Sequence, residues 1–142
     1  MVESHFDKLV SDLEAKLMEQ AREVYSPEVI KHWEQPCNLG RLPSYNTCAK
    51  LTGQCGDSVE WFLEIEGEVI KNVSFLTDGC AGSIACNSVL SEMVKGKSLE
   101  EALSITPEDI IAALGGLPEK DKHCASLAIE TLHTAIRNFW RK

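Results

Sequence analysis

The chain has 142 residues, of which 44% are hydrophobic and 25% are charged, and it carries a formal net charge of −8. These values are ordinary for a globular protein, and the length is sufficient for a single hydrophobic core that needs no disulfide cross-links. The negative charge argues against nucleic acid or an anionic membrane as a partner, and it is compatible with a basic protein partner.

The first eight residues contain no apolar stretch and no arginine-rich amphipathic pattern, so we expect no signal or transit peptide. No apolar run is long enough to span a bilayer. The six cysteines are therefore expected to be reduced thiols in a cytoplasmic protein, where ligand or sulfur chemistry is favoured over disulfides.

Residues 5–24 place apolar side chains at helical spacing, which predicts an amphipathic N-terminal helix that serves as a packing or dimer helix. The apolar stripe consists of Phe6, Leu9, Val10, Leu13, Leu17 and Ala21. Ser26 followed by Pro27 is typical of an N-cap and a first helical residue, and it predicts a short second helix that ends at about Gln35.

Residues 41–57 show no regular pattern and are predicted to be irregular. Residues 58–65 alternate in the period-two pattern of a strand with one buried face. The side chains expected to face the core are Val59, Trp61, Leu63 and Ile65, and those expected on the other face are Ser58, Glu60, Phe62 and Glu64. A turn at Gly67 leads to the hairpin partner, residues 69–75, and Gly79 is predicted to end that strand.

Residues 81–95 are rich in apolar side chains and predict a buried helix. Ser98, in a capping box, and Thr106 are predicted to begin capped helices, residues 115–118 break the chain, and residues 122–140 predict a last, long helix. Together these elements predict an α+β fold, in which a small antiparallel sheet of about three strands is covered by helices, with a long C-terminal helix.

Three short segments contain residue types that bind metals: the thiols of Cys55, Cys80 and Cys124, the carboxylate of Asp57 and the imidazole of His123. Thiolate and imidazole are the ligands preferred by zinc and by the iron of iron–sulfur clusters, whereas a carboxylate is a harder ligand that would hold a cluster loosely. Because Cys80, His123 and Cys124 stand at predicted helix starts, we expect the helix dipole to lower the thiol pKa there.

Other interpretations compete at several positions. Asp57 is alternatively a turn residue, and His123 is alternatively a hydrogen-bond partner of the neighbouring thiol. Cys86 lies within an apolar helix and is predicted to be a core residue. For Cys37 and Cys48 we favour an inert role over a disulfide or additional sulfur chemistry. The histidines predicted to be solvated on helix surfaces are His5, His32 and His133.

The segments Cys55-Gly56-Asp57, Asp78-Gly79-Cys80-Ala81-Gly82-Ser83 and His123-Cys124 resemble those of the IscU/NifU-type iron–sulfur cluster scaffold family. The resemblance extends from Tyr25 to Phe139 and includes Tyr25-Ser26-Pro27-Glu28-Val29-Ile30-Lys31-His32-Trp33-Glu34-Gln35-Pro36-Cys37-Asn38-Leu39-Gly40, which is similar to the family's first helix and its Asn-Pro-x-Asn-x-Gly turn. It implies an IscU/NifU N-terminal-like scaffold domain over residues 25–142, preceded by the helical extension of residues 1–24.

The resemblance also implies a function. A cysteine desulfurase would deliver persulfide sulfur to Cys124, iron would bind, and a labile 2Fe–2S cluster would form and pass to apo-proteins. Cys55, Asp57, Cys80, His123 and Cys124 are the implied ligands, and Zn²⁺ could occupy the same site. Such a protein is a carrier that turns over no small substrate, and a homodimer is possible.

Two departures and two alternatives accompany this resemblance. Cys37 stands where the family's turn usually has a basic residue, and residues 117–122 lack the second proline and the valine of the segment read by an Hsp70-type chaperone, so that partner is not carried over. One alternative is the family branch that binds zinc and accepts sulfur, which carries an insertion missing between Cys80 and Cys124 here. The other is a structural zinc docking module, which would need Cys-x-x-Cys pairs that the sequence lacks.

Overall fold

The computed structural model describes residues 5–141. Its elements in chain order are α1 (His5–Val24), α2 (Pro27–Glu34), β1 (Thr47–Thr52), β2 (Ser58–Glu66), β3 (Val69–Thr77), α3 (Ala81–Val94), α4 (Leu99–Leu103), α5 (Pro107–Ala113), the 3₁₀ turn η1 (Glu119–Asp121) and α6 (Lys122–Trp140). The predicted α+β fold is confirmed: a three-stranded antiparallel sheet is covered by helices, and a long helix follows at the C-terminal side.

The strands lie in the order β1-β2-β3, so each strand pairs with its neighbour in the sequence. The sheet of about three strands was expected, but β1 was not located, because residues 41–57 had been predicted to be irregular. Its six residues alternate only partly between buried and exposed positions. The strand is defined by its partner, since Ala49 lies opposite Trp61 in the antiparallel register with β2. Pairing with a strongly patterned strand therefore decides the conformation of a weakly patterned segment.

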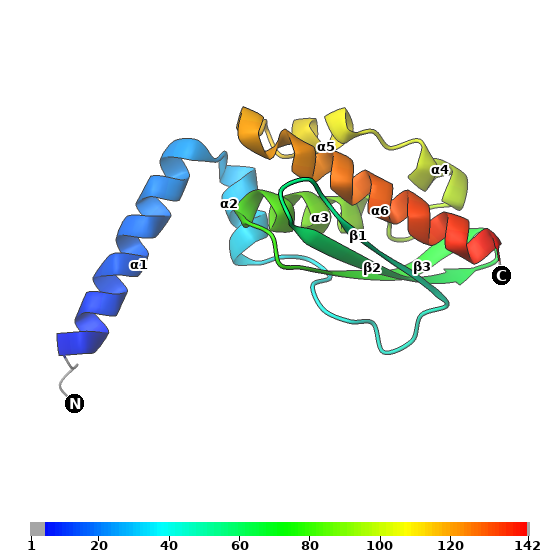
Figure 1. Cartoon of the computed structure of the whole chain (residues 1–142), viewed down its shortest axis with the longest axis horizontal. Helices are drawn as coiled ribbons and strands as arrows, with labels where there is room; N and C mark the ends of the chain where they lie inside the picture. Colours follow the sequence, from blue (N-terminus) through cyan, green and yellow to red (C-terminus); the bar gives the residue numbers. More distant parts are fainter. Residues whose placement is uncertain (1–4, 142) are drawn as a thin grey trace.

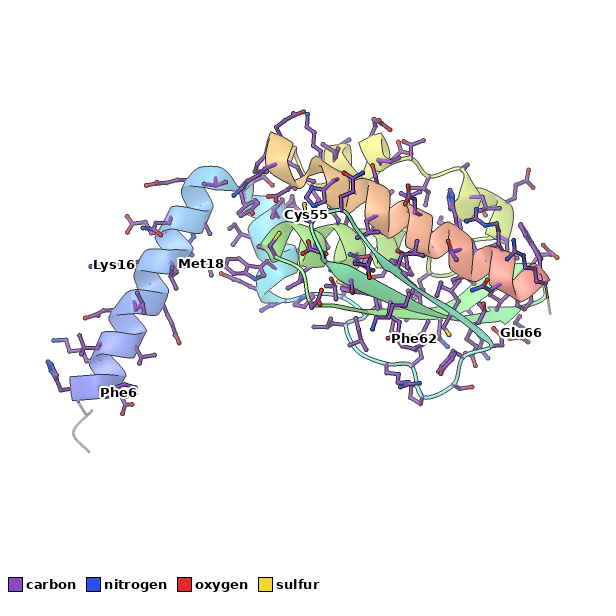
Figure 2. All side chains as sticks on the ribbon, viewed as in Figure 1. Phe6, Lys16, Met18, Cys55, Phe62 and Glu66 are labelled. Carbon is purple, nitrogen blue, oxygen red and sulfur yellow. The ribbon has the colours of Figure 1, made fainter. Side chains whose placement is uncertain are left out.

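The two faces of β2 are less different than the alternation predicted. Phe62, expected on the polar face, is fully buried. It is covered by the loop between α2 and β1, where the Tyr45 ring lies 5.0 Å from the Phe62 ring and the Arg41 guanidinium lies 5.5 Å from its centroid. Figure 2 shows Phe62 on the side of the sheet that carries this loop. A long connection thus covers a face that was expected to be exposed.

The helices α3 and α6 pack on the opposite face of the sheet, α3 against β3 and α6 against β1 and β2 (Figure 1). The Trp61 and Phe75 rings stack in this core at 6.2 Å, and the Trp61 indole N–H donates to Asn87 Oδ1 on α3 at 2.7 Å. At the other edge, the Thr47 hydroxyl of β1 donates to the Ala135 carbonyl of α6 at 2.7 Å. These contacts fix both helices on the sheet.

Two of the three histidines expected on solvated helix surfaces are placed differently. His32 is buried, and its Nδ1 lies 2.7 Å from Ser88 Oγ of α3. His133 is half-buried in α6, and burial lowers its pKa. His5 is exposed, as predicted. His32 lies on α2, which has few residues, and His133 lies on α6, which has a wide apolar face. At neither position is the imidazole fully exposed to solvent, so the prediction failed there.

The helix α1 extends away from the rest of the fold (Figure 1), and none of residues 5–24 is buried. Its apolar stripe is open to solvent, with Phe6 72% and Leu13 58% exposed. The helix itself is confirmed, whereas its role as a packing or dimer helix stays a prediction. Among the described residues, no helix combines the length and the apolar character needed to cross a membrane.

Deleting residues 1–22 is expected to change the free energy of unfolding by less than about 1 kcal/mol, because none of residues 5–22 is buried and exposed residues contribute little to stability. Urea unfolding followed by circular dichroism, together with gel filtration, measures the effect. A loss of several kcal/mol accompanied by conversion of a dimer into a monomer would contradict this expectation and would support the dimer role of α1.

Candidate metal centre

The predicted site residues come from three places in the fold. Cys55 and Asp57 lie in the turn between β1 and β2, Cys80 is the residue that precedes α3, and His123 and Cys124 lie in the first turn of α6. Figure 2 shows Cys55 at the end of the fold where that turn, the beginning of α3 and the beginning of α6 meet. Segments far apart in the sequence thus converge at one end of the molecule.

Four of the five predicted residues fall into two overlapping groups. In the first, the ligand atoms of Asp57, His123 and Cys124 all lie within 4.8 Å of one another. In the second, Cys80, Asp121 and Cys124 meet the same limit. Within these groups, Cys124 Sγ lies 3.7 Å from His123 Nε2. The Cys124 thiol is common to both groups and is therefore the centre of the site.

Cys55 stands apart from both groups. It is exposed and lines an open groove together with His123, Ser126 and Leu127 of α6. It is the one predicted ligand that belongs to neither group. The β1–β2 turn would have to bring this thiol toward Cys124 for all three cysteines to hold one metal centre.

Two glycines allow the close approach of these segments. A Cβ on Gly79 would lie 2.6 Å from Ser83 Cβ and 3.1 Å from the Asp57 carboxylate. A Cβ on Gly82 would lie 3.0 Å from Asp121 Cγ. A side chain at Gly79 would collide with Ser83, and one at Gly82 would press on the Asp121 carboxylate, so the glycines near Cys80 allow this close packing.

Asp121 is the site residue that sequence reasoning missed. It is buried, and its Oδ1 accepts a long hydrogen bond of 3.8 Å from the Cys80 thiol. Its other oxygen, Oδ2, is buried without a hydrogen-bond partner among the described residues. Burial and the nearby Asp121 carboxylate also raise the pKa of Tyr25. The available signal was an acidic residue two positions before the His-Cys pair, at a predicted helix start.

The prediction that the helix start lowers the Cys124 thiol pKa is wrong. Burial raises the pKa of Cys124, and the neighbouring Cys86, Cys80, Asp121 and Asp57 raise it further. Cys124 is 2% exposed, so the loss of hydration of the thiolate outweighs the helix dipole. Without a bound cation this thiol is therefore protonated at neutral pH, and binding of a cation would displace its proton.

The remaining cysteines bear out part of the interpretation. All six are unpaired thiols. Cys86 is fully buried in α3, which confirms it as a core residue, and burial raises its pKa to about 12. Cys37 and Cys48 are half-buried.

The donor set combines sulfur, imidazole nitrogen and carboxylate oxygen, which suits zinc and the iron of iron–sulfur clusters. Residues 24–142 match the model of the NifU-like N-terminal domain family. The chain belongs to this family. The match begins at Val24, the last residue of α1.

Named members of the family are close in sequence. The chain is 40% identical over 121 residues to the iron-sulfur cluster assembly scaffold protein IscU of Aquifex aeolicus, which covers 83% of this chain and 77% of the relative. It is 38% identical over 120 residues to IscU 1, an iron-sulfur cluster assembly scaffold protein of Archaeoglobus fulgidus, which covers 84% and 78%.

The fold of the family is shared by a solved structure. The N-terminal part of a NifU-like protein from Brucella abortus superposes with a TM-score of 0.67 at 19% identity, and the match covers 84% of this chain and 96% of that one. The predicted IscU/NifU N-terminal-like fold is confirmed.

Proposed function

We propose that this protein is a scaffold on which a labile 2Fe–2S cluster is assembled and from which it passes to apo-proteins. The observation that carries the proposal is the convergence of Asp57, Cys80, His123 and Cys124 on the two groups that share the Cys124 thiol. Relatives named as cluster assembly scaffolds support the same role. The cluster is then a cargo, and the protein is a carrier with no small-molecule substrate of its own.

Sulfur would reach the site as a persulfide on a cysteine desulfurase. The Cys124 thiol would first lose its proton to water, and its sulfur would then attack the outer sulfur of that persulfide. A new S–S bond would form on Cys124, and the desulfurase cysteine would leave as a thiolate. Cys124 is buried, so this step needs the surrounding turn to open. The exposed Cys55 and Cys80 lie at the rim of the same site, where iron would first find thiol ligands.

The set of ligands proposed for the cluster is Cys55, Cys80 and Cys124 with Asp57 or His123 in addition. Oxygen binds sulfide-bridged iron less firmly than sulfur does. A carboxylate in the set, on a turn that is open to solvent, would keep the cluster exchangeable. Exchangeability is the property that separates a scaffold from an electron carrier.

The proposal is tested by anaerobic incubation of the protein with ferrous iron, cysteine and a cysteine desulfurase. The expected result is the visible charge-transfer absorption of a 2Fe–2S cluster, followed by its transfer to an apo-ferredoxin. A protein that binds one Zn²⁺ at these residues and accepts persulfide sulfur, but builds no absorbing cluster, would instead be the zinc-binding sulfur acceptor. The cytoplasmic location stays a prediction.

Replacing Asp57 with alanine is expected to leave assembly possible and to slow release of the cluster several-fold, because the variant loses the weak oxygen ligand and the polar edge through which acceptor thiols reach iron. The rate of holo-ferredoxin formation from pre-loaded protein measures the effect. Glu100→Ala, which removes an exposed carboxylate at the start of α4, away from the site, serves as the control. Equal or faster release from Asp57→Ala would show that Asp57 is a turn residue.

A further inference from the structure

A second cluster of metal-ligating side chains lies away from the site described above. It consists of His32 on α2, Cys37 on the turn after α2 and Glu92 on α3, whose ligand atoms all lie within 4.8 Å of one another. Cys37 Sγ donates to Glu92 Oε1 at 3.0 Å, and His32 Nε2 lies 3.6 Å from the same oxygen. The thiol, imidazole and carboxylate therefore face a common point.

Ser88 of α3 holds His32 and Cys37 of this cluster in place. Its hydroxyl oxygen lies 2.7 Å from His32 Nδ1, and it accepts the backbone N–H of Cys37 at 2.8 Å. The contact at Nδ1 leaves Nε2 as the ring nitrogen that faces Glu92. A second ring-nitrogen contact of this kind is how proteins orient a histidine that binds a metal.

The turn that carries Cys37 is itself fixed to α3. Asn38 adopts a positive φ of 59° and its side-chain amide donates to Ser91 Oγ at 3.0 Å. The Ser91 hydroxyl in turn lies 3.3 Å from the Cys37 carbonyl. Cys37 is therefore positioned by contacts that do not depend on a bound cation.

The spacing of the ligand atoms suits a tetrahedral cation. Metal–ligand bonds of about 2.0–2.3 Å separate neighbouring ligands of a tetrahedral Zn²⁺ site by roughly 3.2–3.8 Å. The sulfur–oxygen and nitrogen–oxygen distances of 3.0 and 3.6 Å lie close to this range before any adjustment. We propose that His32, Cys37 and Glu92 form a second metal site, which binds a borderline divalent cation such as Zn²⁺ and leaves the fourth position to water.

Exposure provides a path for the cation. The His32 side chain is 7% exposed, whereas that of Glu92 is 52% exposed and Cys37 is half-buried, so solvent reaches the site at Glu92. Glu92 follows Cys80 by twelve residues along α3, a distance of about 18 Å at 1.5 Å per residue. The two sites are thus separate, and the second needs none of the cysteines of the first. This role replaces the inert role favoured for Cys37 from the sequence.

The test uses Co²⁺, which reports a thiolate ligand through near-ultraviolet charge-transfer absorption. In the full chain carrying Cys55→Ser, Cys80→Ser and Cys124→Ser, we expect one Co²⁺ to bind with this absorption. Adding Cys37→Ser should abolish the band, and adding Cys48→Ser, a matched change at another half-buried thiol, should preserve it. Glu92→Gln should weaken Co²⁺ binding by at least about tenfold, because it removes an anionic ligand.

A second measurement covers the case in which the triple variant does not fold. Native mass spectrometry of the otherwise unaltered chain should show two Zn²⁺ ions, falling to one in Cys37→Ser and staying at two in Cys48→Ser. Circular dichroism checks that each variant is folded. A cobalt band that survives Cys37→Ser, or equal zinc contents of the unaltered chain and Cys37→Ser, would overturn the second site. Neither result bears on cluster assembly, which depends on other cysteines.

Discussion

Cys124→Ser is expected to reduce the reconstituted cluster absorption by at least about tenfold, because one substitution removes the thiol common to both ligand groups. Cys80→Ser removes a member of one group only and should leave a weaker, less stable chromophore. The measurement is the visible spectrum after anaerobic reconstitution, normalised to protein concentration, with bound iron and sulfide determined separately.

Cys48→Ser is the matched control, since it removes a half-buried thiol that belongs to neither group. It should reconstitute like the unaltered protein. Normal reconstitution of Cys55→Ser, Cys80→Ser and Cys124→Ser alike would show that the cluster, if it forms, is held elsewhere. Loss in Cys80→Ser and Cys124→Ser but not in Cys55→Ser would restrict the ligands to the two groups.

Trp61→Ala is expected to lower the free energy of unfolding by about 3–5 kcal/mol, the usual cost of deleting a large aromatic side chain from a core. Trp61 is fully buried, stacks on Phe75, and donates its indole N–H to Asn87 Oδ1. Its loss would leave a cavity beneath α3 and a buried amide oxygen without its donor. Urea unfolding monitored by circular dichroism measures the change.

Two further variants separate the contribution of the Trp61 hydrogen bond from that of its buried ring, and compare Trp61 with an exposed tryptophan. Trp61→Phe keeps most of the ring and loses the hydrogen bond, so it should cost about 1–3 kcal/mol. Trp140→Ala, at the 52% exposed end of α6, should change stability by no more than about 0.5 kcal/mol. A stability of Trp61→Ala equal to that of Trp140→Ala would contradict the placement of Trp61 in the core.

The elements with strong local signals were predictable from the sequence. β2 alternates at every position except Phe62; Ser98 and Thr106 form capping boxes in the structure, and α6 has the long apolar face that was expected. β1 was not predictable, because its conformation depends on β2 as a partner. Phe62 likewise looked like a surface residue, because a periodic pattern cannot show that a distant loop will cover the second face.

The candidate site was predictable in its residue types and only partly in its chemistry. Cys80, Asp57, His123 and Cys124 do converge, because the three segments carrying them end at the same side of the fold. The signal for Asp121 was weak, an acidic residue two positions before the His-Cys pair, because its importance arises from burial beside Cys80 and Gly82. The raised pKa of Cys124 has the same origin, because burial arises when the chain folds and cannot be read from the sequence around Cys124.

The order of the strands also determines at which stage of folding the site can form. β1, β2 and β3 pair through short turns, so their contacts are local and cost little loop-closure entropy. The contact between Thr47 and Ala135 spans 88 residues, and it must wait for α6. We therefore expect the hairpins to form while the chain is still being synthesised, and Cys124 to reach Cys80 only after α6 has left the ribosome. Sulfur and iron delivered earlier would meet isolated thiols instead of a site.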